Sequence, residues 1–222
     1  MTKKTTPDRR TDKALWSTAY HEAGHAVAGW RLGIGLRKKG VTIVPDEAAG
    51  TAGSCTSRWA SNRTIEWDAS DKKRIRVEND VQSLLAGMIA QRRYAPRRRW
   101  RRGAFGDSRV IDDLLTRFTY DQKEIDAWVK LLRIRTQNLL SNPDVWRAVE
   151  RLAAALIERR TIPGPEATEI MREGFYERLY SLHPEMREGQ RGVDGKAESI
   201  QAQTPKRRGY HRDGHRRQCV TY

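Results

Sequence analysis

The chain has 222 residues, which is enough for one large domain or for a domain with a tail. Hydrophobic residues make up 37% and charged residues 32%, and no run of about 18 apolar residues is available for a transmembrane helix. The 43 Lys and Arg against 28 Asp and Glu give a net charge of +15, which favours nucleic acid or another polyanion as a partner without indicating a fold.

The cysteines and the N-terminal residues bear on the compartment. Cys55 and Cys219 are the only two cysteines, too few for a disulfide framework or for a four-cysteine zinc site. The N-terminal residues carry basic side chains without an apolar segment behind them, so no secretory signal is visible. We therefore expect a reducing, cytoplasmic environment and no membrane partner.

The first part of the chain predicts a helix and a strand. Residues 1–12 are polar and show no periodicity, so we expect a flexible lead there. Apolar residues at helical spacing predict a helix over 13–32, ended by a glycine-containing turn. Val41–Val44 is a β-branched run closed by a proline and predicts one short strand. Residues 46–70 predict loop, with room for a second short strand.

Helical periodicity dominates the rest of the predicted domain. The expected helices cover about 75–89, 110–118, 122–140 and 144–159, and a short closing helix covers Glu166–Arg172. Apolar residues then thin out, and 176–222 predicts a basic, disordered tail that cannot bury enough surface to offset its ordering entropy. The sequence thus predicts a mainly α-helical domain over 13–175 with one small β element.

A possible metal site lies in the first predicted helix, which reads His-Glu-Ala-Gly-His over 21–25. His21 and His25 are four residues apart, so their side chains leave one face of the helix and can reach a single zinc ion at about 2.0–2.1 Å. Glu22 lies between them and can serve as a general base toward water. The bare motif also occurs by chance on helices whose histidines face solvent. Here, however, the remaining three of the five histidines all lie in the predicted tail.

Several segments together resemble the FtsH-type (M41) zinc peptidases. Thr18–Val27 is similar to the active-site helix of that family, and Val41–Pro45 is similar to its edge strand beside the cleft. Asp80–Gln91 resembles the helix usually written with a Gly-Gly-Arg-Ala-Ala-Glu core, and Thr161–Ile170 resembles the turn and helix that close the domain. The resemblance covers about 14–175 and implies a helical peptidase domain.

The resemblance also implies a third metal ligand, an aspartate near the start of a later helix. Asp107, Asp112 and Asp113 are the candidates, and in the family small or apolar residues follow the ligand at three, four, seven and eight positions. Only Asp107 fits, since those positions hold Val110, Ile111, Leu114 and Leu115. The residues before Asp107 lack the Ser-Asn of the family's turn, and a plain helix N-cap is the alternative role for Asp107.

The resemblance implies a zinc-dependent endopeptidase that acts on unfolded or flexible protein segments. Its zinc ligands would be His21, His25 and Asp107, and Glu22 would be the catalytic base. The strand made by Val41, Thr42, Ile43 and Val44 would bind an extended substrate by β-addition. The chain shows neither the Gly-x-x-x-x-Gly-Lys-Ser/Thr loop nor the membrane anchor of FtsH-type proteases, so we expect an activity that is ATP-independent in itself or that uses a separate ATPase partner.

An arginine-rich segment suggests a rival function. Arg92–Arg102 holds seven arginines in eleven positions, with Tyr94 and Trp100 between them, a composition suited to phosphate contact and base stacking. The segment could equally be a solvated loop, or line the cleft and favour acidic substrates. The alternative hypothesis is therefore a non-catalytic, zinc-containing M41-like scaffold that binds nucleic acid or another acidic partner through Arg92–Arg102 and the basic tail. An intact Glu22 argues against it, since a structural zinc site needs no base and is usually closed by four protein ligands.

Overall fold

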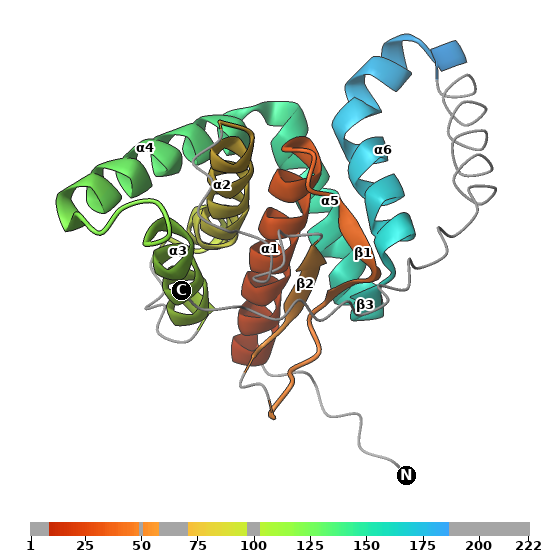
Figure 1. Cartoon of the computed structure of the whole chain (residues 1–222). Helices are drawn as coiled ribbons and strands as arrows, with labels where there is room; N and C mark the ends of the chain where they lie inside the picture. Colours follow the sequence, from red (N-terminus) through yellow and green to blue (C-terminus); the bar gives the residue numbers. More distant parts are fainter. Residues whose placement is uncertain (1–8, 49–50, 58–70, 97–102, 187–222) are drawn as a thin grey trace, which may run out of the picture. The chain divides into compact units, whose positions relative to one another are not determined.

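The computed structural model describes residues 9–48, 51–57, 71–96 and 103–186. There the protein is mainly helical with one small antiparallel sheet, which confirms the predicted fold class (Figure 1). In chain order the elements are α1 (Arg9–Arg31), β1 (Leu36–Thr42), β2 (Ser54–Ser57), α2 (Asp71–Tyr94), α3 (Gly103–Leu115), α4 (Gln122–Ser141), α5 (Pro143–Arg159), β3 (Thr161–Ile162) and α6 (Gly164–Leu182). The chain divides into two units, 1–178 and 179–222, and the candidate site described below lies in the first.

Each predicted helix is present, but the ends differ, and α3 (Gly103–Leu115) begins and ends earlier than the predicted 110–118. α1 begins at Arg9, so the last residues of the expected N-terminal lead are helical. α6 continues to Leu182, past the predicted short helix Glu166–Arg172 and past the predicted domain end at 175. Buried Met171 and Gly174 show why, because a Cβ added to Gly174 would lie only 2.9 Å from the Cα of Ala148 on α5. The first eight residues and the tail beyond 186 lie outside the described residues.

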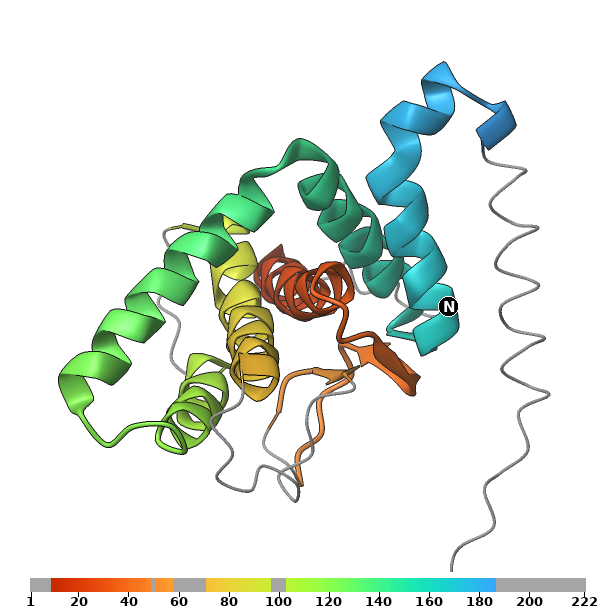
Figure 2. The same cartoon turned by 45° about the horizontal axis from the view of Figure 1, so that its top comes forward.

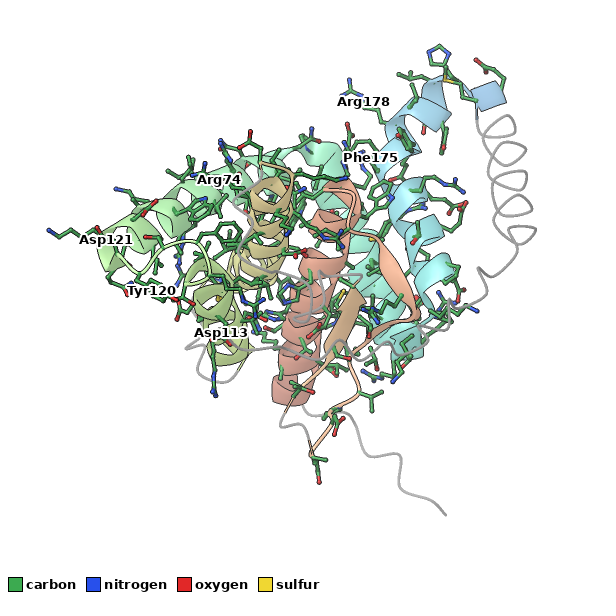
Figure 3. The ribbon with its side chains drawn as sticks, in the orientation of Figure 1. Arg74, Asp113, Tyr120, Asp121, Phe175 and Arg178 are labelled. Atoms are coloured by element: carbon green, nitrogen blue, oxygen red, sulfur yellow. The ribbon has the colours of Figure 1, made fainter. Side chains whose placement is uncertain are left out.

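Asn142 and Pro143 determine where α4 ends and α5 begins. The Asn142 Oδ1 atom accepts hydrogen bonds from the backbone N–H groups of Asp144 and Val145, at 2.9 and 3.3 Å. Pro143 opens α5, where its missing N–H would have had no helical partner. At the other end of α4, the Asp121 side chain labelled in Figure 3 accepts a hydrogen bond from the N–H of Lys123 at 2.9 Å. α4 and α5 therefore begin and end close to the predicted bounds.

The sheet has the strand order β2-β1-β3, with both pairs antiparallel. β1 covers Leu36–Thr42, so the prediction of a strand over Val41–Val44 is wrong in extent, and Ile43 and Val44 follow the strand. The sequence pattern did not predict the first half of β1, because this half contains Arg-Lys-Lys and lacks alternating apolar residues. Gly40 has a φ of 70°, and a Cβ there would lie 2.0 Å from the Ile162 oxygen. Only glycine lets β1 approach β3 so closely.

The buried apolar side chains form two clusters that share one helix. The first cluster joins α1, β1, α5 and α6 and includes Ala86 and Ala90 of α2. The second joins α2, α3 and α4, and its buried members are Val77, Val81, Leu84, Leu85, Ile111, Leu114, Leu115, Ile125 and Leu132. Figure 2 shows α1 between α2 and α5. Within the described ranges, none of the helices combines the length and apolar character that a membrane crossing needs.

Candidate metal centre

Two histidines of α1 meet at the interface with α2. His21 and His25 are both buried, and their Nε2 atoms lie 2.9 Å apart. The close packing of the two helices makes this possible: a Cβ on Gly24 would lie 2.7 Å from the Ala86 carbonyl oxygen of α2. The small residues between the histidines thus let the backbone of α2 lie against the site.

Hydrogen bonds from α2 orient both imidazole rings. The His25 Nδ1 atom lies 2.8 Å from the Ser83 carbonyl oxygen, and the Ser83 hydroxyl donates to the His25 carbonyl oxygen at 3.1 Å. A carbonyl oxygen can only accept, so Nδ1 of His25 carries the proton and a neutral ring presents its lone pair at Nε2. The His21 Nδ1 atom lies 3.2 Å from Oε1 of Gln91. These contacts are the outer contacts that metal-binding histidines ordinarily have.

The third group of the site comes from α3. The Asp107 Oδ2 atom lies 3.2 Å from Nε2 of His21 and 3.4 Å from Nε2 of His25. It is buried and accepts no well-directed hydrogen bond within the described part of the chain. Asp107 is an interior residue of α3, which begins at Gly103, so the N-cap alternative is excluded. Asp112 and Asp113 are exposed on the same helix, and Figure 3 labels Asp113.

The three side chains fit a divalent metal ion. Four ligands at about 2.0–2.1 Å from a tetrahedral ion are separated from one another by about 3.3 Å. The separations here are 2.9, 3.2 and 3.4 Å. Two imidazole lone pairs and a carboxylate oxygen would repel one another at this range unless a proton or a metal ion lay between them. The His21, His25 and Asp107 group could therefore hold a metal ion, with further positions left for other ligands.

Without metal, the cluster binds a proton tightly. Burial lowers the pKa of His25, but its contacts with Asp107, Glu22 and the Ser83 carbonyl outweigh burial and raise the pKa to about 9. Burial raises the pKa of Asp107, but the two histidines outweigh it and hold that carboxyl well below its usual range. The cluster thus favours a positive charge among the three groups, as a cation site requires.

Glu22 lies beside this cluster under the loop before β2. The side chain is buried, and a Cβ on Gly53 would lie 3.0 Å from its Oε1 atom. Burial raises the pKa of Glu22, and Asp107 raises it further, while His25 and His21 act in the opposite direction. A carboxyl group with a raised pKa next to a metal-ligand cluster is suited to accept and release a proton.

Several residues of the site were not found from the sequence. Ser83, Gly87 and Gln91 all lie on α2 and follow one another at four-residue spacing, which places them on one face. A Cβ on Gly87 would lie 2.3 Å from Nε2 of His25, so this position must stay small. These small and polar residues interrupt an otherwise apolar helix face. The pattern indicates a role in the site only once that face is known to cover the histidines.

The structure does not leave Val41–Val44 as the free edge strand that the resemblance implies. Val41 and Thr42 lie in the middle strand and pair with β2 on one side and with β3 on the other, so they offer no free edge for an added strand. Ile43 is buried and its N–H donates to the Arg160 carbonyl oxygen at 2.8 Å. Val44 is 50% exposed but lies beyond the strand. In the described part of the chain, β2 is the edge strand next to Glu22.

Two side chains in the described part of the arginine-rich segment contact other helices. Tyr94 stacks on Tyr20 with ring centroids 4.2 Å apart and lies near Trp16 at 6.3 Å. The Arg93 guanidinium lies 3.9 Å from the ring centre of Trp146 and donates to the Leu140 carbonyl oxygen. Tyr94 thus packs against the domain, whereas Arg92 and Arg93 stay exposed. Residues 97–102, which carry most of the predicted nucleic-acid contacts, lie outside the described residues.

Comparison of the sequence with protein-family models and with curated proteins found no match. The likeness to FtsH-type peptidases stays a resemblance of sequence motifs. The candidate metal-ligand group, by contrast, follows from three side chains that the fold brings together from α1 and α3, although Asp107 lies more than 80 positions after His25.

Proposed function

We propose that this chain is a zinc-dependent endopeptidase of the FtsH (M41) type that cleaves unfolded or flexible protein segments. The observation that carries the proposal is the convergence of His21, His25 and Asp107 next to the buried carboxyl group of Glu22. Two imidazoles and one carboxylate form a ligand set that suits zinc, and three protein ligands are typical of catalytic zinc sites.

The residues divide the chemistry between them. A bound zinc ion would supply Lewis-acid polarisation of the scissile carbonyl and a lowered pKa for a water molecule. Glu22 would take the proton from the attacking water and pass it to the amine nitrogen as the C–N bond breaks. The raised pKa of Glu22 suits this exchange, because the carboxyl must hold the proton between the two steps.

The substrate strand in this proposal is β2 rather than β1. β2 directly follows Gly53, which packs on Glu22, and it forms an edge of the sheet. An extended segment that paired with Ser54–Ser57 would run past the catalytic carboxylate. Main-chain pairing requires an unfolded or flexible substrate and gives little sequence preference. An open pocket lined by Arg37, Cys55, Thr56 and Ser57 adjoins this strand.

The test is cleavage of a fluorescently labelled, unfolded protein by the zinc-loaded chain in the absence of ATP. We expect Glu22→Gln to retain zinc and to lose activity by about 10²–10⁴-fold. Glu47→Gln changes an exposed carboxylate in the same way and should leave activity unchanged. Equal activity of Glu22→Gln and the wild type, or no cleavage by a wild type that holds one zinc ion, would overturn the proposal. The second outcome would favour the non-catalytic scaffold.

A further inference from the structure

We infer that Gln91 is a positioning residue that fixes the His21 ring with its Nε2 lone pair toward the metal ion. The inference rests on the proposed function, because it concerns the same metal centre. Gln91 is half-buried on α2, its Oε1 atom lies 3.2 Å from Nδ1 of His21, and its Nε2 atom donates to the Ser17 hydroxyl oxygen at 3.0 Å. Ser17 lies one turn before His21 on α1 and is 1% exposed.

The direction of the amide decides which nitrogen of His21 can bind metal. A neutral imidazole carries one proton, and an amide oxygen facing Nδ1 requires that proton to be on Nδ1. If the amide were reversed, its NH₂ group would face Nδ1, and a neutral ring would then carry its proton on Nε2, where it blocks metal binding. In this orientation the amide N–H donates to the Ser17 hydroxyl oxygen at 3.0 Å, which anchors the amide beside His21. With its oxygen toward Nδ1, Gln91 therefore favours the metal-binding form of the ring.

The two histidines differ in this respect. His25 faces the Ser83 carbonyl of the backbone, which can only accept. His21 faces a side chain, so its orientation depends on the residue at 91. Gln91 is also neutral. It leaves the carboxylates of Asp107 and Glu22 as the two negative charges around a divalent ion, whereas Gln91→Glu would add a third.

The experiment compares the zinc affinity of the full chain with Gln91→Leu and Gln91→Glu variants, measured by competition with a chromophoric chelator. Gln91→Leu removes the acceptor, and we expect a loss of about 10–100-fold in zinc affinity. Gln91→Glu restores an acceptor and should bind zinc at least as tightly as the wild type. Gln122→Leu is the matched control, because it removes an exposed amide that is hydrogen-bonded within its own helix, to Asp126. Thermal unfolding of each metal-free variant shows whether the loss reflects folding.

A second readout is the protonation of the ring nitrogens of His21, observed by ¹⁵N NMR of the metal-free chain. We expect Nδ1 of His21 to be protonated in the wild type and only in part of the molecules in Gln91→Leu. Unchanged zinc affinity of Gln91→Leu, equal losses in both variants, a fall in metal-free stability that accounts for the loss, or a bare Nδ1 in the wild type would each overturn the inference. If the wild type bound no zinc, the proposed function would fail, while the NMR result would still decide the role of Gln91.

Discussion

α1 and α3 bring the candidate metal-binding side chains to one point by different means. On α1, the rings of His21 and His25 each donate from Nδ1 to an oxygen of α2. On α3, no well-directed hydrogen bond within the described residues reaches Oδ2 of Asp107, whose position follows from the apolar packing of the helix that carries it. The difference teaches that the histidine half of the site is fixed by polar contacts, and the aspartate half by the second apolar cluster.

The largest effect on zinc affinity should come from a substitution that crowds the histidine half of the site. In Gly87→Ala the new Cβ would overlap the His25 ring, 2.3 Å from its Nε2 atom, and we expect zinc affinity to fall at least about 100-fold. Chelator competition measures this loss. The matched control is Gly106→Ala in α3, where a Cβ meets nothing within 4 Å. That variant should keep zinc and gain up to about 1 kcal/mol in stability from helix propensity. Wild-type zinc affinity in Gly87→Ala would contradict the described packing.

A smaller effect should follow from loosening the aspartate half. Leu115→Ala opens a cavity in the second cluster, where the side chain is fully buried, and should lower the unfolding free energy by about 2–5 kcal/mol. Because that cluster positions Asp107, zinc affinity should fall as well. Leu156→Ala creates a similar cavity in the first cluster and should cost similar stability with a smaller change in zinc affinity. Denaturant unfolding and zinc titration of both variants test this, and equal changes in zinc affinity would contradict the comparison.

The smallest effect concerns pH and the metal-free protein. The pKa of His25 is raised from 6.5 to about 9 in the folded chain, because its contacts with Asp107 outweigh burial. A group with a raised folded pKa stabilises the fold fully below its unfolded pKa and ceases to do so as pH rises through the folded value. The unfolding temperature of the metal-free chain should therefore fall between about pH 6.5 and pH 9. Asp107→Asn should flatten this decline, and an equally steep decline in that variant would show that another group causes it.

The sequence predicted much of this arrangement and missed the part that depends on tertiary contact. The spacing of His21 and His25 and the apolar pattern after Asp107 are local signals, and the structure brings these residues together. The extent of β1 was missed because its first half is basic, and its edges could not be assigned before the pairing with β3 was known. Gly87 and Gln91 act across a helix interface, and no local pattern marks a residue whose role is to contact a ring on another helix.

The most direct test of the metal centre is the zinc content of four purified chains after zinc loading and removal of free metal. These chains are the wild type, His25→Ala, Asp107→Ala and Asp113→Ala, the last changing an exposed carboxylate on the same helix as Asp107. We predict one zinc ion per chain in the wild type and in Asp113→Ala, and a loss of zinc in His25→Ala and Asp107→Ala. A wild type without zinc, or equal zinc in all four chains, would contradict the assignment of the site.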